Sequence, residues 1–208
     1  MFGSRLFFLF LFFFQWGIAQ KLVEKAVHNP KTKYVRIDVT KCYRLVLDTH
    51  TSDFLKIEAT MEGEYAKDLV IKLEENGDNI TISADFLPSF DIPNDKLSAH
   101  KVISIEMHVT LPESMTTSVH GTHTNVTAKG TYKHLSVTLA DGNCTLDNIS
   151  EKAEVKTQTG EIVLKGARGT VTTKNIYGKV EKGPVPQGNQ IYSLQTVEGS
   201  IIVNKNNG

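Results

Sequence analysis

Four glycines recur in the C-terminal half of the chain at nearly constant spacing, each at the same place in a short repeated pattern. Gly142, Gly160, Gly178 and Gly199 are 18, 18 and 21 residues apart. Three positions around each glycine are mostly apolar or small. Two positions after the glycines lie Cys144, Ile162, Val180 and Ile201. Five positions before them lie Val137, Val155, Thr173 and Leu194, and seven positions before them lie Leu135, Ala153, Val171 and Tyr192. A unit of two short strands meeting at a glycine cannot bury its apolar face alone, whereas stacked units share a continuous core.

The repeats predict an all-β protein, a β-solenoid with short coils of 18–21 residues. The apolar columns stay in phase with the glycines, which favours this fold over the alternative, an antiparallel sandwich with evenly spaced hairpins. Gly121 lies 21 residues before Gly142 and is a candidate first member of the series, although its neighbours Val119 and Val126 fit only in a shifted register.

The preceding residues, 35–111, predict a less regular, strand-rich half of antiparallel or solenoid-like strands. Apolar and polar residues alternate with the period of a half-buried strand in residues 35–39, 45–47, 54–59, 69–73, 80–86 and 103–111. Asn76-Gly77-Asp78 lies between two of these segments and predicts a tight hairpin, because Asn-Gly tolerates positive φ angles. Residues 87–101 predict a long loop, and residues 65–69 a single helical turn.

The first nineteen residues have the features of a signal peptide. One basic residue, Arg5, precedes an apolar run over residues 6–14, and the small residues Gly17 and Ala19 match a cleavage site. The apolar run is shorter than the roughly 20 residues that a membrane-spanning helix needs. We therefore expect cleavage after Ala19 and a single mature domain over residues 20–208, made of the halves 35–111 and 118–204; an uncleaved anchor is the alternative. No later segment is apolar enough to span a bilayer.

The repeats also resemble those of a known family. Residues 135–146 (LSVTLADGNCTL), 155–164 (VKTQTGEIVL) and 194–203 (LQTVEGSIIV) are similar to the degenerate repeats of exported bacterial proteins described as adhesins, which are common in the Bacteroidetes. Residues 94–105 (NDKLSAHKVISI) also resemble flavobacterial members. The resemblance covers most of residues 35–204 and implies a right-handed β-helix-like fold and an envelope location. It implies no particular ligand and brings no catalytic residues with it.

The charge balance argues against nucleic acid as a partner. Lys and Arg number 23, as do Asp and Glu, and loss of Arg5 with the signal peptide leaves a net charge of −1. A near-neutral chain has no general attraction to phosphates.

Two sets of side chains are candidate metal ligands. His120 and His123, with His134 and His108, have spacings found in zinc sites, but the sequence lacks a recognisable third and fourth ligand, so solvated turn histidines are the better interpretation. Asp85, Asp91, Asn94 and Asp95 could offer oxygen atoms to calcium, but neither an EF-hand spacing nor a Gly-Gly-x-Gly-x-Asp repeat is present. We predict no metal and no cofactor.

Carboxylates are the main candidates for catalysis, because some β-helical proteins cleave polysaccharides. Asp141 and Glu198 precede repeat glycines, but Thr159 and Tyr177 occupy the same position in the repeats between them. Glycoside hydrolysis needs two carboxyl groups roughly 5–9.5 Å apart, one with a raised pKa. The sequence also lacks a Gly-x-Ser-x-Gly elbow, a P-loop and a Rossmann fingerprint. We therefore predict no catalytic residues.

Cys42 and Cys144 form an even pair in an exported chain, which permits a disulfide. Because Cys144 lies in an apolar column, a buried free thiol is the alternative. Glycosylation sequons begin at Asn79, Asn125, Asn143 and Asn148. Such matches arise easily by chance in a β protein that is rich in Asn and Thr.

These observations favour a non-enzymatic, exported protein of the cell envelope that binds an unknown carbohydrate or protein ligand, in the periplasm, on the surface or outside the cell. A polysaccharide-active enzyme on the same scaffold and a periplasmic structural or assembly component are the alternatives.

Overall fold

The computed structural model describes residues 20–90 and 103–204, and nearly every element in them is a β-strand. The exception is one 3-10 turn, η1 (Ala66–Asp68), where a helical turn was expected. The strands are β1 (Lys21–Val27), β2 (Tyr34–Asp38), β3 (Arg44–His50), β4 (Leu55–Gly63), β5 (Leu69–Asn76), β6 (Asn79–Phe86), β7 (Ile103–Pro112), β8 (Met115–Gly121), β9 (Asn125–Asp141), β10 (Cys144–Thr159), β11 (Ile162–Lys165), β12 (Thr170–Asn175), β13 (Val180–Lys182), β14 (Ile191–Thr196) and β15 (Ile201–Val203). The predicted all-β fold is confirmed.

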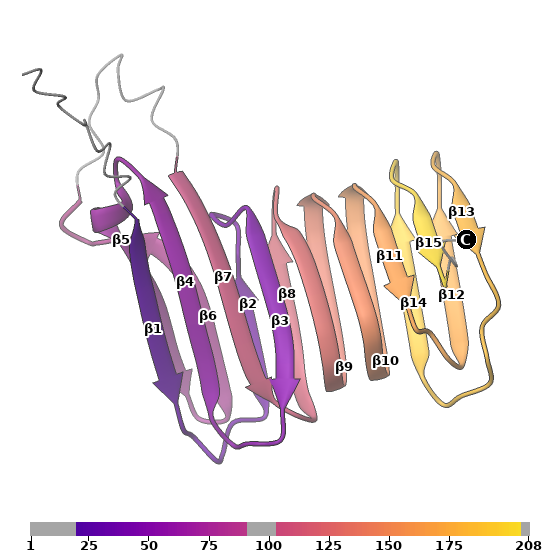
Figure 1. Ribbon diagram of the computed structural model, residues 1–208, viewed down its shortest axis with the longest axis horizontal. Helices are drawn as coiled ribbons and strands as arrows, with labels where there is room; N and C mark the ends of the chain where they lie inside the picture. Colours follow the sequence, from indigo (N-terminus) through magenta and orange to yellow (C-terminus); the bar gives the residue numbers. More distant parts are fainter. Residues whose placement is uncertain (1–19, 91–102, 205–208) are drawn as a thin grey trace, which may run out of the picture.

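The strands lie side by side along the long axis of the molecule in two facing layers (Figure 1). Layer A has the order β1-β4-β7-β3-β9-β10-β11-β15-β13, and layer B the order β5-β6-β2-β8-β9-β10-β14-β12. The long strands β9 and β10 belong to both layers. The bend in β9 lies at Gly130, which has a φ of 119°, and the bend in β10 follows Asn148, which has a φ of 51°.

The apolar columns predicted from the repeats are confirmed by strand pairing. Cys144 pairs with Ile162, Ile162 with Ile201, and Ile201 with Val180, all between parallel strands. The other two columns pair in the same way, as Leu135–Ala153–Tyr192–Val171 and Val137–Val155–Leu194–Thr173. Antiparallel pairing is confined to β1, β4, β5, β6 and β7 among the described strands, so the antiparallel sandwich is wrong for the repeat half.

The last two repeats are stacked out of chain order. β14 lies between β10 and β12, and β15 between β11 and β13. The final repeat, 191–203, therefore fills the place next to 153–164, and the earlier repeat, 171–182, forms the end of the stack. The inward residues agree with this order, because the inserted repeat offers Tyr192, Leu194, Ile201 and Val203, all buried, whereas the terminal repeat offers Val171, Thr173, Val180 and Lys182, none of them buried. Repeat stacks are stabilised when the more polar repeat forms the end.

The glycine corners allow neighbouring repeats to approach closely. A Cβ atom on Gly160 would collide with the carbonyl oxygen of Gly142, and one on Gly199 with the carbonyl oxygen of Gly160. On the other side of Gly142 the equivalent position in the preceding strand turn is occupied by Thr124. The hydroxyl of Thr124 donates to the carbonyls of Val39 and Cys42, both at 2.7 Å. Thr124, and not Gly121, is thus the first member of the series, which accounts for the shifted register.

The N-terminal half mixes parallel pairs with antiparallel ones. The predicted hairpin is confirmed, since β5 and β6 pair from Leu69↔Phe86 to Asn76↔Asn79 across a two-residue turn with Gly77 at a φ of 64°. β1, β4 and β7 are antiparallel neighbours, and β7 then pairs in parallel with β3. Most of the loop predicted over 87–101 lies outside the described residues.

One hydrophobic core fills the space between the layers along the described chain. Its largest fully buried side chains include Tyr132 and Tyr192, whose hydroxyls donate to the backbone carbonyls of Lys129 and Ile149. Lysines cross the gap between the layers at both ends. Lys21 and Lys25 of β1 donate to the carbonyls of Leu69 and Ile71 in β5, each at 2.7 Å, and Lys182 of β13 donates to Val171 in β12 at 3.1 Å. Inward-pointing lysines of this kind protect exposed strand edges.

Candidate functional site

The outer face of layer A carries paired charges. Lys56 lies 3.1 Å from both Glu24 and Glu58, and Arg44 lies 3.5 Å from Glu106. His108, one of the candidate zinc ligands, lies 2.8 Å from Asp48 and 4.0 Å from Glu58. Most charges on this face therefore already have a partner of opposite sign.

The outer face of layer B mixes hydroxyl groups with charged side chains. Strand pairing aligns its side chains in rows across the strands. One row is Thr81–Arg36–Ser118–Ser136–Glu154–Ser193–Thr172, and the next is Ser83–Asp38–His120–Thr138–Lys156–Gln195–Lys174. Side chains in such rows stand on a framework whose strands lie about 4.8 Å apart. The face is thus a broad polar surface with fixed spacing.

A groove of about 340 Å³ lies on this face over β6, β2 and β8. We call it the Tyr34–Arg36 groove, after the two central side chains, which come from β2. β6 and the end of β5 provide Asn79, Thr81 and Asn76 on one side, and β8 provides Thr116 and Ser118 on the other. Tyr34 is 47% exposed, and the buried residues Val35 and Ile80 form the floor.

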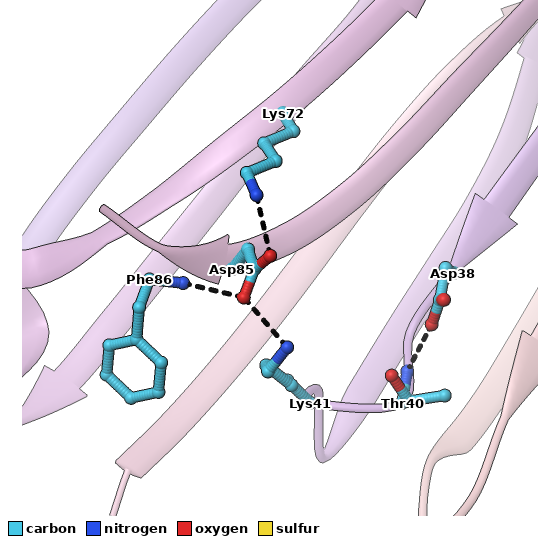
Figure 2. Close-up of polar contacts among 6 residues, drawn as sticks. All are labelled: Asp38, Thr40, Lys41, Lys72, Asp85 and Phe86. Carbon is cyan, nitrogen blue, oxygen red and sulfur yellow. Dashed lines mark hydrogen bonds and ion pairs between the residues drawn. The ribbon is translucent and has the colours of Figure 1, made fainter. Parts of the chain in front are cut away.

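Asp85 fixes the edge of layer B beside this region (Figure 2). Its carboxylate accepts hydrogen bonds from Lys41 at 2.8 Å, from Lys72 at 2.6 Å and from the backbone N–H of Phe86 at 2.9 Å. These three donors, Lys41 first, hold the pKa of Asp85 well below its usual range. Asp85 therefore joins β5, β6 and the β2–β3 corner. The other residues considered as calcium ligands, Asp91, Asn94 and Asp95, lie outside the described residues.

The remaining candidate zinc ligands do not converge. His123 lies 3.2 Å from Asp141, His120 faces outward from layer B, and the Nε2 atom of His134 is buried without a hydrogen bond to any described residue. Across residues 20–90 and 103–204, no group of three or more His, Cys, Asp or Glu side chains is arranged to hold a metal.

The two carboxylates considered for catalysis are separated by one repeat. Thr159 pairs with Asp141, and Glu198 belongs to the repeat that stacks on the other side of Thr159. Hydrogen bonds from Thr159 and His123 lower the pKa of Asp141. A general acid in glycoside hydrolysis needs the opposite shift, so Asp141 is unsuited to that role.

Both cysteines are free and buried, so the alternative of a buried free thiol is confirmed and the disulfide is wrong. Cys42 lies at the β2–β3 corner and Cys144 begins β10. Burial raises the pKa of each thiol to about 12, and in Cys42 the nearby Asp38 adds to the shift. Neither thiol is suited to act as a nucleophile near neutral pH.

Two of the sequon asparagines have a structural role. The side-chain oxygen of Asn125 accepts from the N–H of Asn143 at 3.2 Å, and that of Asn143 accepts from the N–H of Glu161 at 2.8 Å. These bonds link successive repeats beside the glycine corners.

A larger cleft of about 570 Å³ lies near the C-terminal turns, beside Lys165, Arg168 and Pro184. Asn204 lines it but is already bonded, since its amide donates to the carbonyls of Ala167 at 2.9 Å and Pro184 at 3.0 Å. Lys165 lies beside Asp147 in the strand register. We take the Tyr34–Arg36 groove as the candidate site because its lining residues all lie in paired strands of layer B, whereas the larger cleft is lined mostly by turns. Sequence reasoning did not identify the groove, although the alternation at Tyr34-Val35-Arg36 places Tyr34 and Arg36 on one face.

No described helix is long and apolar enough to cross a membrane.

The fold is shared with a solved protein from Clostridium sporogenes described as a "putative cell adhesion protein". The two structures align with a TM-score of 0.60 at 14% identity, over 89% of this chain and 99% of that one. A "putative adhesin" from Bacteroides fragilis aligns over 88% of this chain and 97% of that one, at 13% identity and a TM-score of 0.41. No protein-family model matches the chain, and no curated protein is significantly similar to it. The resemblance noted in the repeats thus extends to the fold.

Proposed function

We propose that the chain is an exported, non-enzymatic β-solenoid protein that binds a ligand at the cell envelope through the outer face of layer B. The observation that carries this proposal is the Tyr34–Arg36 groove, an open site on a rigid polar layer. The parallel columns and glycine corners support the solenoid description. A fold shared with a protein described as a cell adhesion protein is consistent with this function.

Export depends on the first nineteen residues. We propose that they are removed and that residues 20–208 form one domain. N-terminal sequencing of protein recovered from the periplasm or medium is expected to begin at Gln20 or within about two residues of it. Full-length protein recovered only from the cytoplasm would contradict export.

Binding without catalysis is supported by the state of the candidate groups. Asp141 has a lowered pKa, and both thiols have raised pKa values and are buried.

Two threonines on one strand provide a matched test. Thr138 faces outward from layer B and Thr127 from layer A, and both are exposed residues of β9. Mature protein is immobilised and its retention of polysaccharide and protein fractions from cell envelopes is measured. Thr138→Glu is expected to reduce retention, and Thr127→Glu to leave it unchanged. Equal effects of the two substitutions would refute a role for the wider face of layer B.

The same assay separates the alternatives. Incubation with acidic and neutral polysaccharides is expected to produce no new reducing ends or unsaturated products. Turnover abolished by Asp141→Asn or Glu198→Gln would support the enzyme instead, and co-purification with an envelope protein alone would support the assembly component.

A further inference from the structure

The side chains of the Tyr34–Arg36 groove form two short rows. Strand register places Tyr34 between Asn79 and Thr116, and Arg36 between Thr81 and Ser118. Each row crosses three strands, so an aromatic ring and a guanidinium group stand next to each other at the centre, flanked by an amide and hydroxyls. A ligand lying along β2 meets both rows.

Arg36 has no partner in the described chain, unlike the cations beside Asp85 and Glu106. It makes no ion pair and no side-chain hydrogen bond within residues 20–90 and 103–204. By contrast, Lys41 and Lys72 bind Asp85, and Arg44 binds Glu106. Arg36 is the one charged side chain that lines the groove. Asp38 and Glu74 are the nearest acids on this face in the strand register, but neither lines the groove.

The other polar groups of the groove are also available. Asn79 donates through its amide nitrogen to Asp78 at 2.9 Å, which leaves its side-chain oxygen as an acceptor. The side chains of Thr81, Thr116 and Ser118 make no hydrogen bond with the part of the chain that the structure describes. Hydroxyl groups both donate and accept, so such a set can serve a ligand with many hydroxyls.

We infer that the Tyr34–Arg36 groove binds an oligosaccharide that carries carboxylate groups, such as a chain of uronic acids. The guanidinium of Arg36 is planar and permanently charged and forms paired hydrogen bonds with a carboxylate. The exposed ring of Tyr34 offers an apolar surface for the C–H face of a sugar ring, and the amides and hydroxyls bind the sugar hydroxyls. This inference rests on the proposed function and names the ligand class of the same site.

The chemistry of the groove disfavours other ligand classes. A nucleic acid would need several cations along its path, and the groove has one. An apolar ligand would need a lining of apolar side chains, whereas here the walls are polar and the apolar residues lie in the floor.

The test compares each acidic oligosaccharide with its own neutral form. Binding of the mature protein to oligogalacturonate, oligoguluronate and a sialylated oligosaccharide is measured by calorimetry, beside their methyl esters and a sulfated glycan. At least one carboxylate ligand is expected to bind about tenfold or more tightly than its ester, because esterification removes the charge-assisted bonds to Arg36. Preference for the sulfated glycan alone, or no binding of any carboxylate ligand, would overturn the inference.

Two arginines of similar exposure give the matched variants. Arg36→Gln is expected to weaken binding of the acid about tenfold and leave the ester unaffected, whereas Arg44→Gln on layer A leaves both unchanged. Tyr34→Ala is expected to weaken both forms. If Thr138→Glu abolishes retention of envelope fractions while Arg36→Gln has no effect on the acid, binding by layer B stands and the carboxylate assignment falls. If Thr138→Glu and Thr127→Glu act alike while Arg36→Gln is selective, the groove binds carboxylates and the wider face of layer B does not contribute.

Discussion

β5 and β6 are joined by a two-residue turn and pair antiparallel, whereas every described pairing of β9 to β15 is parallel. The N-terminal half combines one local hairpin with long-range parallel and antiparallel pairs, and ion pairs such as those of Asp85 link its strands (Figure 2). The repeat half gains its order from equivalent residues stacked in columns and from glycine corners. The two halves share one core and yet depend on different features of the sequence.

The largest expected effect tests whether both halves depend on that core. Ile162 in β11 and Ile82 in β6 are both fully buried. Replacing either with Asp buries an unpaired carboxylate and is expected to lower the free energy of unfolding by about 4 kcal/mol or more. Glu161→Lys and Ser200→Lys, next to the inward columns, are expected to stay within about 0.5 kcal/mol. Denaturant unfolding measures all four, and equal losses would show that the assigned register is wrong.

Replacing a glycine is expected to cost more stability in the repeat half than in the N-terminal half. Gly160 has a φ of 137° and a Cβ atom there would meet the backbone of the neighbouring repeat, whereas a Cβ atom on Gly77 would meet nothing within 4 Å. Gly160→Ala is therefore expected to cost about 3 kcal/mol, and Gly77→Ala about 1 kcal/mol, from its φ alone. The comparison fails if thermal unfolding gives the two variants the same loss.

Acid pH is expected to act mainly on the N-terminal half. The folded-state pKa of Asp85 is lowered, so its ionised form stabilises the fold above the ordinary carboxyl pKa of about 3.9, and this contribution is lost as the pH falls below that value. Because the side chain is 36% exposed, we expect Asp85→Asn to cost only about 1 kcal/mol at pH 7 and progressively less below about pH 4.

The control for this experiment lies in the repeat half. Glu154 binds Lys156 at 2.6 Å and also has a lowered pKa, but it has one cationic partner in place of two. Glu154→Gln is expected to change stability by about 0.5 kcal/mol or less at pH 7. A larger effect than that of Asp85→Asn would reverse the comparison.

The smallest expected difference is in the labelling rates of the two thiols, of which one lies in each half. Both have pKa values raised by burial to about 12, so neither is expected to react with iodoacetamide at pH 8 until it is exposed. Cys42 lies at a corner and Cys144 within the parallel stack, so Cys42 is expected to be labelled roughly threefold faster through local opening. Mass spectrometry of timed samples measures both rates, and faster labelling of Cys144 would show that the repeat half opens first.

The pairing columns could be predicted because three apolar positions recur at fixed distances from each glycine. The hairpin at Gly77 could be predicted because Asn-Gly fixes a local backbone geometry. The stacking order of the last two repeats could not, because both fit the same register. Lys182 and Thr173 at inward positions were the available signal that residues 171–182 form the end of the stack. The Tyr34–Arg36 groove depends on which strands flank β2, and that pairing is not encoded within β2.

The exchange of order at the C-terminus has a consequence for how the chain is assembled. A chain delivered from its N-terminus completes residues 171–182 before residues 191–203 exist, and at that moment the free edges of β10 and β11 are open to them. Residues 191–203 can pair with those edges only if residues 171–182 have not paired with them or dissociate from them. Folding of the C-terminal end is therefore a competition between residues 171–182 and residues 191–203 for the edges of β10 and β11. The segment that is made later is the more apolar one, and it occupies those edges in the folded protein.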